Sequence, residues 1–260
     1  MQPTQFIKVP IQKNALLEKA VSLVNSNEEL QTLWKINNVN AIDRLGFSDH
    51  GYTHFQIVTN IALRIGRILH KNNVQMSITK NYELPYDYAE VVIFLASVMH
   101  DIGMSINREG HEELSLFIAR DLLKEMLREY SIEERTILIA EILHAIMSHR
   151  SDGNPLTIEA GIVRVADALD MTKGRSRIPF TAGKVNIHSL SAYAIEKVDI
   201  VEGKEKPIRV DILMNNSSGF FQVDELLKKK LHNSGIAHFM EIRAYTNNAR
   251  EENIIKEYFV

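Results

Sequence analysis

Four residues of this chain have side chains that bind metals and positions that make such a role plausible. His54 opens an apolar helical segment, and His100 and Asp101 are neighbours at the end of a second one. Asp167 lies inside a third apolar segment. A carboxylate in such surroundings needs a compensating cation, and divalent metals accept imidazole nitrogen together with carboxylate oxygen. If the three helices pack side by side, these side chains can meet at one point.

Each of these residues also has an ordinary explanation when it is taken alone. A single histidine such as His54 is more often a surface or capping residue, and a His-Asp dipeptide is common. Asp167 can pair with Arg164, three residues earlier on the same helix face. The combination is more informative than any member, because the pieces lie on separate predicted helices.

The composition narrows the chemistry. The chain has 260 residues, 45% of them hydrophobic, which allows one large domain or two modest ones. It contains no cysteine, which excludes disulfides, thiolate nucleophiles and sulfur-ligated zinc sites. A nucleophile is therefore expected to be a hydroxyl or a metal-bound water. The formal net charge of −3 gives no broad basic field, so no DNA partner is expected.

Two features argue against a membrane. The first ten residues lack the apolar core of a signal peptide. The longest apolar run, Val91–Met99, is too short to span a bilayer and is typical of a helix buried on all sides. We therefore expect a cytoplasmic protein without a membrane partner.

Apolar residues recur at helical spacing through the first 180 residues. We expect helices over 14–35, 53–69, 88–99, 111–130, 132–149 and 158–171. Residues 72–85 are polar and predict a loop, and Gly103 is expected to stop the helix before it. Ser131 and Glu134 fit a capping box. The fold class is mainly α, a helical bundle.

The pattern changes after about residue 180. Strict alternation at 208–214 predicts a strand, with further strands at 193–201 and 238–245 and a short helix at 223–231. We therefore expect a helical domain over 1–180 and a small α+β unit over 181–260, ordered strand, strand, helix, strand. We expect this unit to act in regulation or in the formation of a homo-oligomer. Lys228–Lys230 is most simply a solvated helix face.

Three segments resemble the motifs of the HD superfamily of metal-dependent phosphohydrolases. They are His54-Phe-Gln-Ile-Val58, Leu95-Ala-Ser-Val-Met-His-Asp-Ile-Gly103 and Val165-Ala-Asp-Ala-Leu-Asp170. The resemblance covers about residues 45–175, and the motifs are specific as a set although each is short. That family is defined by a His, a His-Asp pair and a distant Asp on an all-helical bundle. The resemblance implies that His54, His100, Asp101 and Asp167 hold the primary metal, with His100 and Asp101 central to catalysis.

Many members of that family bind a second metal through two further histidines. His111 and His149 stand in suitable places, and the alternative for both is an exposed histidine at a helix end. His144 is a weaker rival of His149, because it lies in the middle of an apolar helix. His50 is close enough to His54 in the chain to line the site. The resemblance also suggests that Asp101 bridges the two metals.

The implied reaction is hydrolysis of a phosphate ester. Two ions of Mn, Fe, Ni, Co, Zn or Mg would neutralise phosphate oxygens, and a metal-bound hydroxide would attack phosphorus. The expected substrate is a phosphomonoester or phosphodiester of a nucleotide or a related small phosphate. Four cationic residues are candidates for holding the remaining phosphate oxygens: Arg150, Lys173, Arg175 and Arg177. The alternative for the last three is a solvated loop.

The sequence departs from parts of the family, and two other functions stay open. Met104 stands where a lysine often follows the His-Asp pair, which removes one phosphate-binding cation. Asp152-Gly153 is not followed by the signature of cyclic dinucleotide phosphodiesterases, and we see no synthetase segment of an alarmone enzyme. The main alternative is a non-catalytic sensor or scaffold that binds metal or nucleotide. A weaker one is a di-iron oxygenase.

Overall fold

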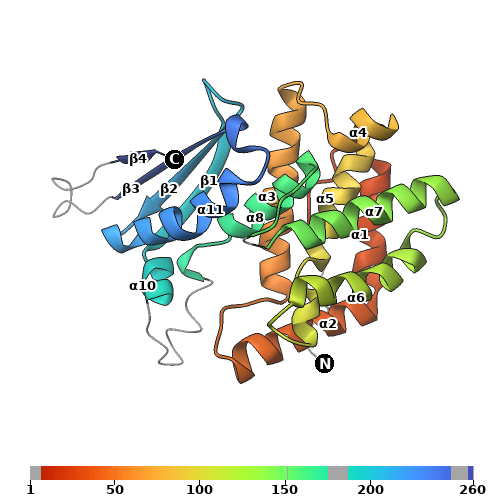
Figure 1. Cartoon of the computed structure of the whole chain (residues 1–260), viewed down its shortest axis with the longest axis horizontal. Helices are drawn as coiled ribbons and strands as arrows, with labels where there is room; N and C mark the ends of the chain where they lie inside the picture. The colour runs from red at the N-terminus through yellow and green to blue at the C-terminus, as the bar shows by residue number, and fades with distance from the viewer. Residues whose placement is uncertain (1–6, 151, 175–186, 247–256, 260) are drawn as a thin grey trace.

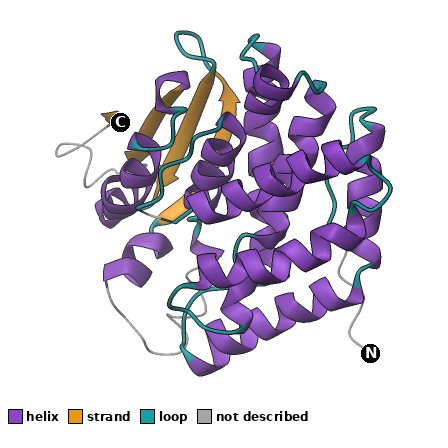
Figure 2. Cartoon of the chain, turned by 45° about the vertical axis from the view of Figure 1, so that its right-hand side comes forward, coloured by secondary structure: helices purple, strands orange, loops and turns teal. Residues whose placement is uncertain are grey.

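The chain folds into a helical bundle with a small sheet packed on one side. The computed structural model describes residues 7–150, 152–174, 187–246 and 257–259. Figure 1 shows the helical part on the right and the sheet on the left, with α3 and α8 at the boundary. Figure 2 shows the strands gathered at one side while helices make up the rest. The prediction of a mainly α fold with a small α+β unit is confirmed.

The helical part is built around one central helix. Its α-helices are α1 (Ala15–Ser26), α2 (Glu28–Asn38), α3 (Tyr52–Lys71), α4 (Ser77–Tyr82), α5 (Tyr86–Met99), α6 (His111–Met126), α7 (Ile132–Ser148) and α8 (Ile158–Leu169), with shorter turns η1 (Val39–Arg44) and η2 (Ile102–Ser105). Helix α5 contacts α1, α3, α7 and α8, and every residue from Ala89 to Met99 is buried. This burial follows from the continuous apolar composition of α5, because a helix that is hydrophobic on every face is buried on all sides.

The apolar run of α5 extends further than the sequence suggested. In the described part of the chain, the segment Tyr86–Ser105 is long and apolar enough to cross a membrane by length and composition. However, 89% of the 18-residue apolar stretch in this segment is buried inside the structure. The segment therefore serves as the core helix of the bundle.

Two local expectations were wrong for reasons that the sequence pattern does not show. The helix expected over 14–35 is divided at Asn27, whose side chain accepts a hydrogen bond from the amide of Leu30 and caps α2. The loop expected over 72–85 contains α4. The carboxylate of Glu159 accepts hydrogen bonds from the first amides of α4, at Ser77 and Ile78, and so stabilises this helix from a distant part of the chain.

Gly103 serves close packing, and not the helix stop that we expected. Helix α5 ends at Met99, and a Cβ atom at Gly103 would lie 2.1 Å from the carbonyl oxygen of His111. Only glycine therefore allows the start of α6 to approach the end of α5 this closely. By contrast, the capping box of Ser131 and Glu134 is present at the start of α7.

The C-terminal unit contains a sheet with strand order β1-β2-β3-β4. Its elements are α10 (Ile187–Tyr193), β1 (Ile195–Glu202), β2 (Ile208–Met214), η3 (Ser217–Gly219), η4 (Gln222–Leu227), α11 (Lys228–His232), η5 (Ala237–Phe239), β3 (Met240–Thr246) and β4 (Glu257–Phe259). β1 and β2 pair antiparallel, as do β3 and β4, whereas β2 and β3 are parallel. The parallel pair needs a crossover, which η4 and α11 supply. The order strand, strand, helix, strand was predicted, and β4 was not.

The two parts share one hydrophobic core. Helix α3 contacts β1 and β2, and α8 contacts η4 and α11. A Cβ atom at Gly161 of α8 would lie 2.2 Å from the carbonyl oxygen of Ser234, so this glycine lets the turn after α11 approach α8 closely. A domain boundary near residue 180 would fall outside the described residues, and the division into two domains stays a prediction.

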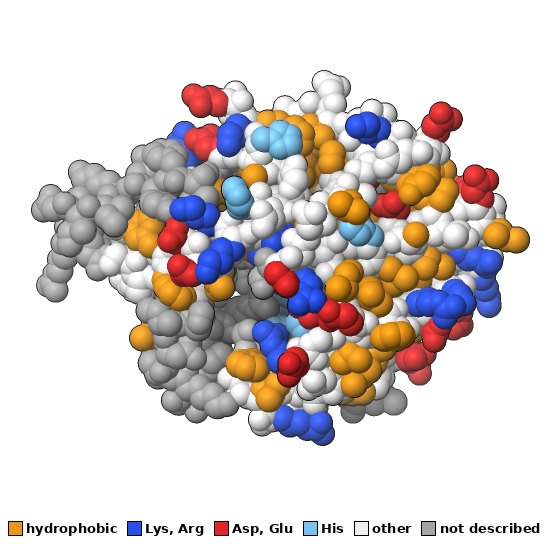
Figure 3. All heavy atoms as spheres, in the orientation of Figure 1, with side chains coloured by type: hydrophobic (Ala, Val, Ile, Leu, Met, Phe, Trp, Pro, Cys, Tyr) orange, Lys and Arg blue, Asp and Glu red, His pale blue; other side chains and the backbone are white. Residues whose placement is uncertain are grey.

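Among the described residues, the face drawn in Figure 3 has no large patch of one charge sign. Basic and acidic side chains are interspersed there over both parts of the molecule. Some large apolar side chains are exposed on the helical part, among them Phe117 of α6 and Ile132 of α7. An oligomer and the other expected partners stay predictions.

Candidate metal centre

The structure brings all six predicted ligands to one place. Each of them lies at or near the end of a helix: His54 in α3, His100 and Asp101 after α5, His111 in α6, His149 after α7 and Asp167 in α8. None of the six is more than 9% exposed. Helix ends converge because α3, α7 and α8 pack on α5 while α6 packs on α7 and η2.

Asp101 stands between two pairs of histidines. Its Oδ1 atom lies 3.0 Å from Nε2 of His111 and 3.2 Å from Nε2 of His149. Its Oδ2 atom lies 3.5 Å from Nε2 of His54 and 3.4 Å from Nε2 of His100. The two oxygens of one carboxylate therefore face different sets of imidazole nitrogens.

Asp167 closes the half of the centre that contains His54 and His100. Its Oδ1 atom lies 3.4 Å from Nε2 of His54 and 3.7 Å from Nε2 of His100, and those two nitrogens are 3.1 Å apart. Its Oδ2 atom forms an ion pair with Nζ of Lys230, from α11. Ligand atoms of His54, His100 and Asp167 all lie within 4.8 Å of one another, a spacing that a single ion can span.

All four histidines present the same nitrogen to the centre. Each Nδ1 donates a hydrogen bond away from it: His54 to Asp170, His100 to the carbonyl of Ser97, His111 to that of Arg108 and His149 to that of Ile146. These acceptors fix a proton on Nδ1, so that Nε2 of each ring is the nitrogen directed inward. Outer hydrogen bonds of this kind orient histidine ligands in metal sites.

The electrostatics keep the carboxylates ionised. Burial would raise the pKa of Asp101, but His100, His111 and His149 outweigh it and hold the pKa well below its ordinary value. Burial opposes ionisation of Asp167 as well, and Lys230 and His100 are among the groups that hold its pKa well below the ordinary value. Ionised carboxylates are the form that binds cations.

The pKa values of His100 and His149 are shifted in opposite directions. Burial alone would lower the pKa of His100, yet Asp101 and Asp167 raise it to about 8. Burial also lowers the pKa of His149, and there it prevails with help from the positive charges of His100 and Lys230. The cluster thus concentrates negative charge around His100, where a cation is stabilised.

The residues fit a divalent metal. The donors are imidazole nitrogens and carboxylate oxygens without sulfur, which suits Mn, Fe, Co, Ni, Zn and, less well, Mg. Two further groups of potential ligands adjoin the first, one of His100, Asp101 and His149 and one of His111, Glu112 and His149. Glu112 was not predicted, and its only sequence cue is its position next to His111.

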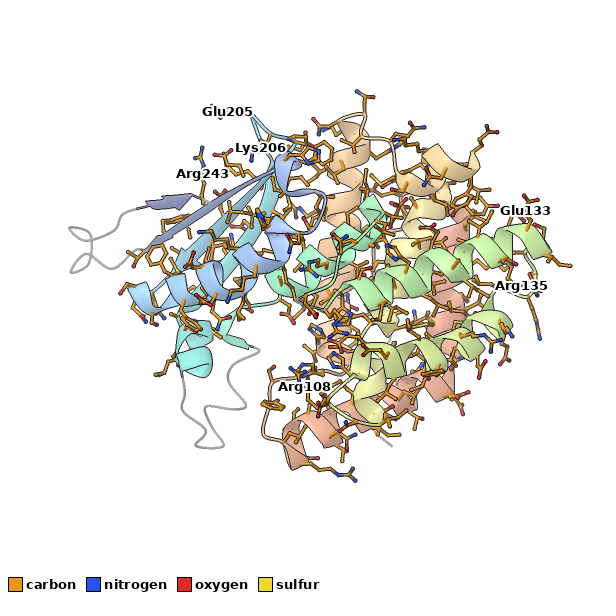
Figure 4. The ribbon with its side chains drawn as sticks, viewed as in Figure 1. Arg108, Glu133, Arg135, Glu205, Lys206 and Arg243 are labelled. Carbon is orange, nitrogen blue, oxygen red and sulfur yellow. The ribbon has the colours of Figure 1, made fainter. Side chains whose placement is uncertain are left out.

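Of the two other histidines considered, one lines the centre and one does not. His50 is buried, with its ring centroid 5.7 Å from that of His54. Its Nε2 atom lies 3.5 Å from Nη1 of Arg108, which Figure 4 labels at the edge of the bundle. His144 instead accepts a hydrogen bond from the amide of Leu156 through its Nε2 atom, in the loop after α7. His149 therefore occupies the place for which His144 was the rival.

Sequence reasoning missed two charged neighbours of the ligands. Asp170 has a usable cue, because it follows Asp167 by three residues, the spacing of one helix face. Lys230 has none: it lies 63 residues beyond Asp167 in a run of three lysines. Lys228 and Lys229 do form ordinary surface pairs, with Asp224 and Glu225. The prediction of a solvated face is wrong for Lys230, whose side chain is 18% exposed.

The candidates for phosphate binding stay predictions. Arg150 follows His149 directly, and its guanidinium donates to Glu113 and Asp152. Lys173 is exposed just beyond α8. Arg175 and Arg177 lie outside the described residues.

Comparisons with known proteins agree with this geometry. The sequence model of the HD domain matches residues 51–172, a range that contains all six candidate ligands. Uncharacterized protein MJ1020 of Methanocaldococcus jannaschii is 40% identical over 232 residues, which cover 89% of this chain and 89% of that protein. No solved structure matches the chain. With its His, His-Asp and Asp motifs assembled at one centre, the chain belongs to the HD domain family.

Proposed function

We propose that this chain is a metal-dependent phosphohydrolase that cleaves a phosphomonoester or phosphodiester of a nucleotide or a related small phosphate. The observation that carries the proposal is the position of Asp101, with one carboxylate oxygen toward His54 and His100 and the other toward His111 and His149. A carboxylate that faces two sets of ligands is suited to bridge two ions.

The residues divide naturally between two metals. His54, His100 and Asp167 would hold the first, His111 and His149 the second, and Asp101 both. Bound divalent ions neutralise phosphate oxygens and lower the pKa of a coordinated water to about 7.

The chain's own groups would prepare the site for this chemistry. The Nδ1 hydrogen bonds keep the four imidazoles oriented before any metal arrives, which lowers the cost of assembling the centre. The near-complete burial of the ligands excludes bulk water and strengthens electrostatic interactions there. Arg108 and Lys230 supply positive charge at the edge, where an anionic substrate would approach.

A catalytic role is favoured over a non-catalytic sensor because the ligand set is complete. A sensor needs only enough ligands to bind a metal, so it would tolerate the loss of one of the six. Here each of the four histidines also has its orienting hydrogen bond, an arrangement that matters most where ligand geometry affects a reaction.

The test is a screen of nucleotides and simple phosphoesters with Mn, Fe, Co, Ni, Zn and Mg. It should include p-nitrophenyl phosphate and bis-p-nitrophenyl phosphate, which separate monoesterase from diesterase activity. We expect hydrolysis that chelation abolishes and that Asp101→Asn strongly reduces, since the amide lacks the negative charge and one of the two oxygens that face the histidines. Asp121→Asn is the control, because this carboxylate is exposed and paired with Arg120. Hydrolysis that Asp101→Asn leaves unchanged would overturn the proposal.

A further inference from the structure

Lys230 brings a positive charge from the C-terminal unit into the candidate metal centre. Its Nζ atom forms an ion pair with Oδ2 of Asp167, and only 18% of its side chain is exposed. Its neighbours Lys228 and Lys229 are 51% and 63% exposed and pair with acidic residues of their own helical segment. Three consecutive lysines therefore have two different environments, and one of them faces the ligands.

The backbone of Lys230 is fixed by a buried arginine. Arg164 of α8 is fully buried, and its Nε atom donates to the carbonyl oxygen of Lys230 at 2.8 Å. The same guanidinium donates to the carbonyl oxygens of Ser148 and Arg150, which flank His149. One side chain thus holds both Lys230 and the segment of His149 in place. Such anchoring distinguishes Lys230 from a flexible surface lysine, which loses much rotamer entropy when it is ordered.

The position of Lys230 on Asp167 is informative. Oδ1 of Asp167 faces His54 and His100, while Oδ2 faces Lys230, so the ammonium lies beside the ligand set. An ammonium has three donors, and Asp167 is the one side-chain partner found for it among the described residues. The remaining donors are available to an anion next to the first metal position.

A cation at this point would work against metal binding alone. It competes with the metal for the charge of Asp167 and repels a divalent ion at short range. A site that only needed to hold metal would be better without it. A cation beside the metal is useful where a negatively charged group must bind at the same place, and lysine is a common phosphate-binding residue.

We propose that Lys230 binds a non-bridging oxygen of the substrate phosphate, so that the C-terminal unit completes the active site of the helical bundle. This inference rests on the proposed function and adds a substrate-binding residue to it. It gives the C-terminal unit a direct part in the reaction, in addition to the regulatory or oligomeric role expected from the sequence.

The experiment compares metal binding with phosphate binding in the full chain. The variants are Lys230→Met, which keeps the length of the side chain without its charge, Lys230→Arg, which keeps the charge, and Lys229→Met as the matched control. The affinity for Mn²⁺ is measured first. The affinity of the Mn²⁺-saturated protein for inorganic phosphate and the KM for p-nitrophenyl phosphate follow.

We expect Lys230→Met to weaken phosphate binding by on the order of tenfold to a hundredfold, the effect of losing one charge-assisted hydrogen bond. Its affinity for Mn²⁺ should be unchanged or higher, because the competing cation is gone. Lys230→Arg should keep most of the phosphate affinity, and Lys229→Met should match the wild type. A general structural defect would weaken both kinds of binding together, so a loss of phosphate affinity without a loss of Mn²⁺ affinity identifies substrate binding.

Two results would overturn this inference. One is wild-type phosphate affinity in Lys230→Met, and the other is a loss of Mn²⁺ affinity in parallel with that for phosphate. If Lys230→Met does not fold, Lys230→Gln provides the same comparison. Failure of the proposed function is distinguishable from failure of this inference. It would appear as absence of Mn²⁺ binding or of hydrolysis already in the wild type, before any change at position 230.

Discussion

Nδ1 of His54 donates a hydrogen bond to Oδ2 of Asp170 over 2.6 Å, and both side chains are almost completely buried. The contact joins the first turn of α3 to the residue after α8, two segments 116 residues apart in the chain. It fixes the orientation of the imidazole, so that Nε2 faces Asp101 and Asp167. Asp170 therefore positions His54, one of the six candidate ligands.

Asp170→Asn tests this orienting contact. The amide can still accept a hydrogen bond, but it lacks the negative charge that makes His54 a stronger ligand. We expect the affinity for Mn²⁺ to fall by about tenfold to a hundredfold, the usual range for loss of an outer partner of a metal ligand. Isothermal titration calorimetry measures the change, with Asp121→Asn as control. Equal affinities of wild type and Asp170→Asn would show that this hydrogen bond does not support the site.

Metal stoichiometry tests the two histidines that face Oδ1 of Asp101. We expect His111→Ala and His149→Ala each to lower the metal content from about two ions per chain towards one. His144→Ala is the matched control for His149, because His144 lies in α7 just before His149 but bonds to the amide of Leu156. Elemental analysis of the purified proteins gives the numbers. Two ions in both variants would remove these histidines from the ligand set.

Metal affinity should depend on pH through His100. The pKa of this histidine is raised from 6.5 to about 8, so a metal must displace its proton at neutral pH. We expect the affinity for Mn²⁺ to rise by up to about tenfold per pH unit between 6.5 and 8, and then to level off. The stability of the metal-free chain should change in the opposite direction and fall as the pH rises. The proton stabilises the metal-free chain below pH 6.5, and this contribution is lost as pH rises through 8.

Titrations with Mn²⁺ at pH 6.5, 7.5 and 8.5 check the affinity, and melting temperatures of the metal-free protein check the stability. Because the affinity for Mn²⁺ rises with pH, the stabilisation of the fold by bound Mn²⁺ should also increase across this range. An affinity that does not change with pH would contradict the assignment of His100 as a ligand.

The basic segment after α8 provides a separate test of phosphate binding. Arg175 lies outside the described residues, but Asp167 lies in the last turn of α8 and Arg175 follows that helix by six residues. We expect Arg175→Ala to lower kcat/KM by roughly tenfold to a hundredfold while metal content stays unchanged. Lys229→Met again serves as a control for loss of surface charge. Unchanged kinetics would mean that the segment is merely solvated, and Arg150 would be tested next.

The sequence was sufficient to predict the residues that act through local motifs. His54, the pair His100-Asp101 and Asp167 stand in short motifs on separate helices, and all four meet in the structure. The capping box of Ser131 could also be predicted, because both of its partners lie within one turn. Such features depend on spacing along the chain, which a sequence displays directly.

Features that depend on contacts between distant segments could not be predicted. Glu159 stabilises α4 from 81 residues away, and Lys230 reaches Asp167 from a run that otherwise behaves as a solvated face. Gly103 has the sequence appearance of a helix stop, although its function is to admit the carbonyl of His111. In each case the partner is chosen by packing, and neither residue type nor periodicity identifies it.

Anomalous diffraction from crystals of the full chain grown with Mn²⁺ tests the central claim most directly. The account predicts two manganese peaks on either side of Asp101, roughly 3.5–4 Å apart, as in two-metal hydrolytic sites. One should be bound by His54, His100 and Asp167, and the other by His111 and His149. A single peak, with His111 and His149 turned away from it, would contradict the two-metal centre.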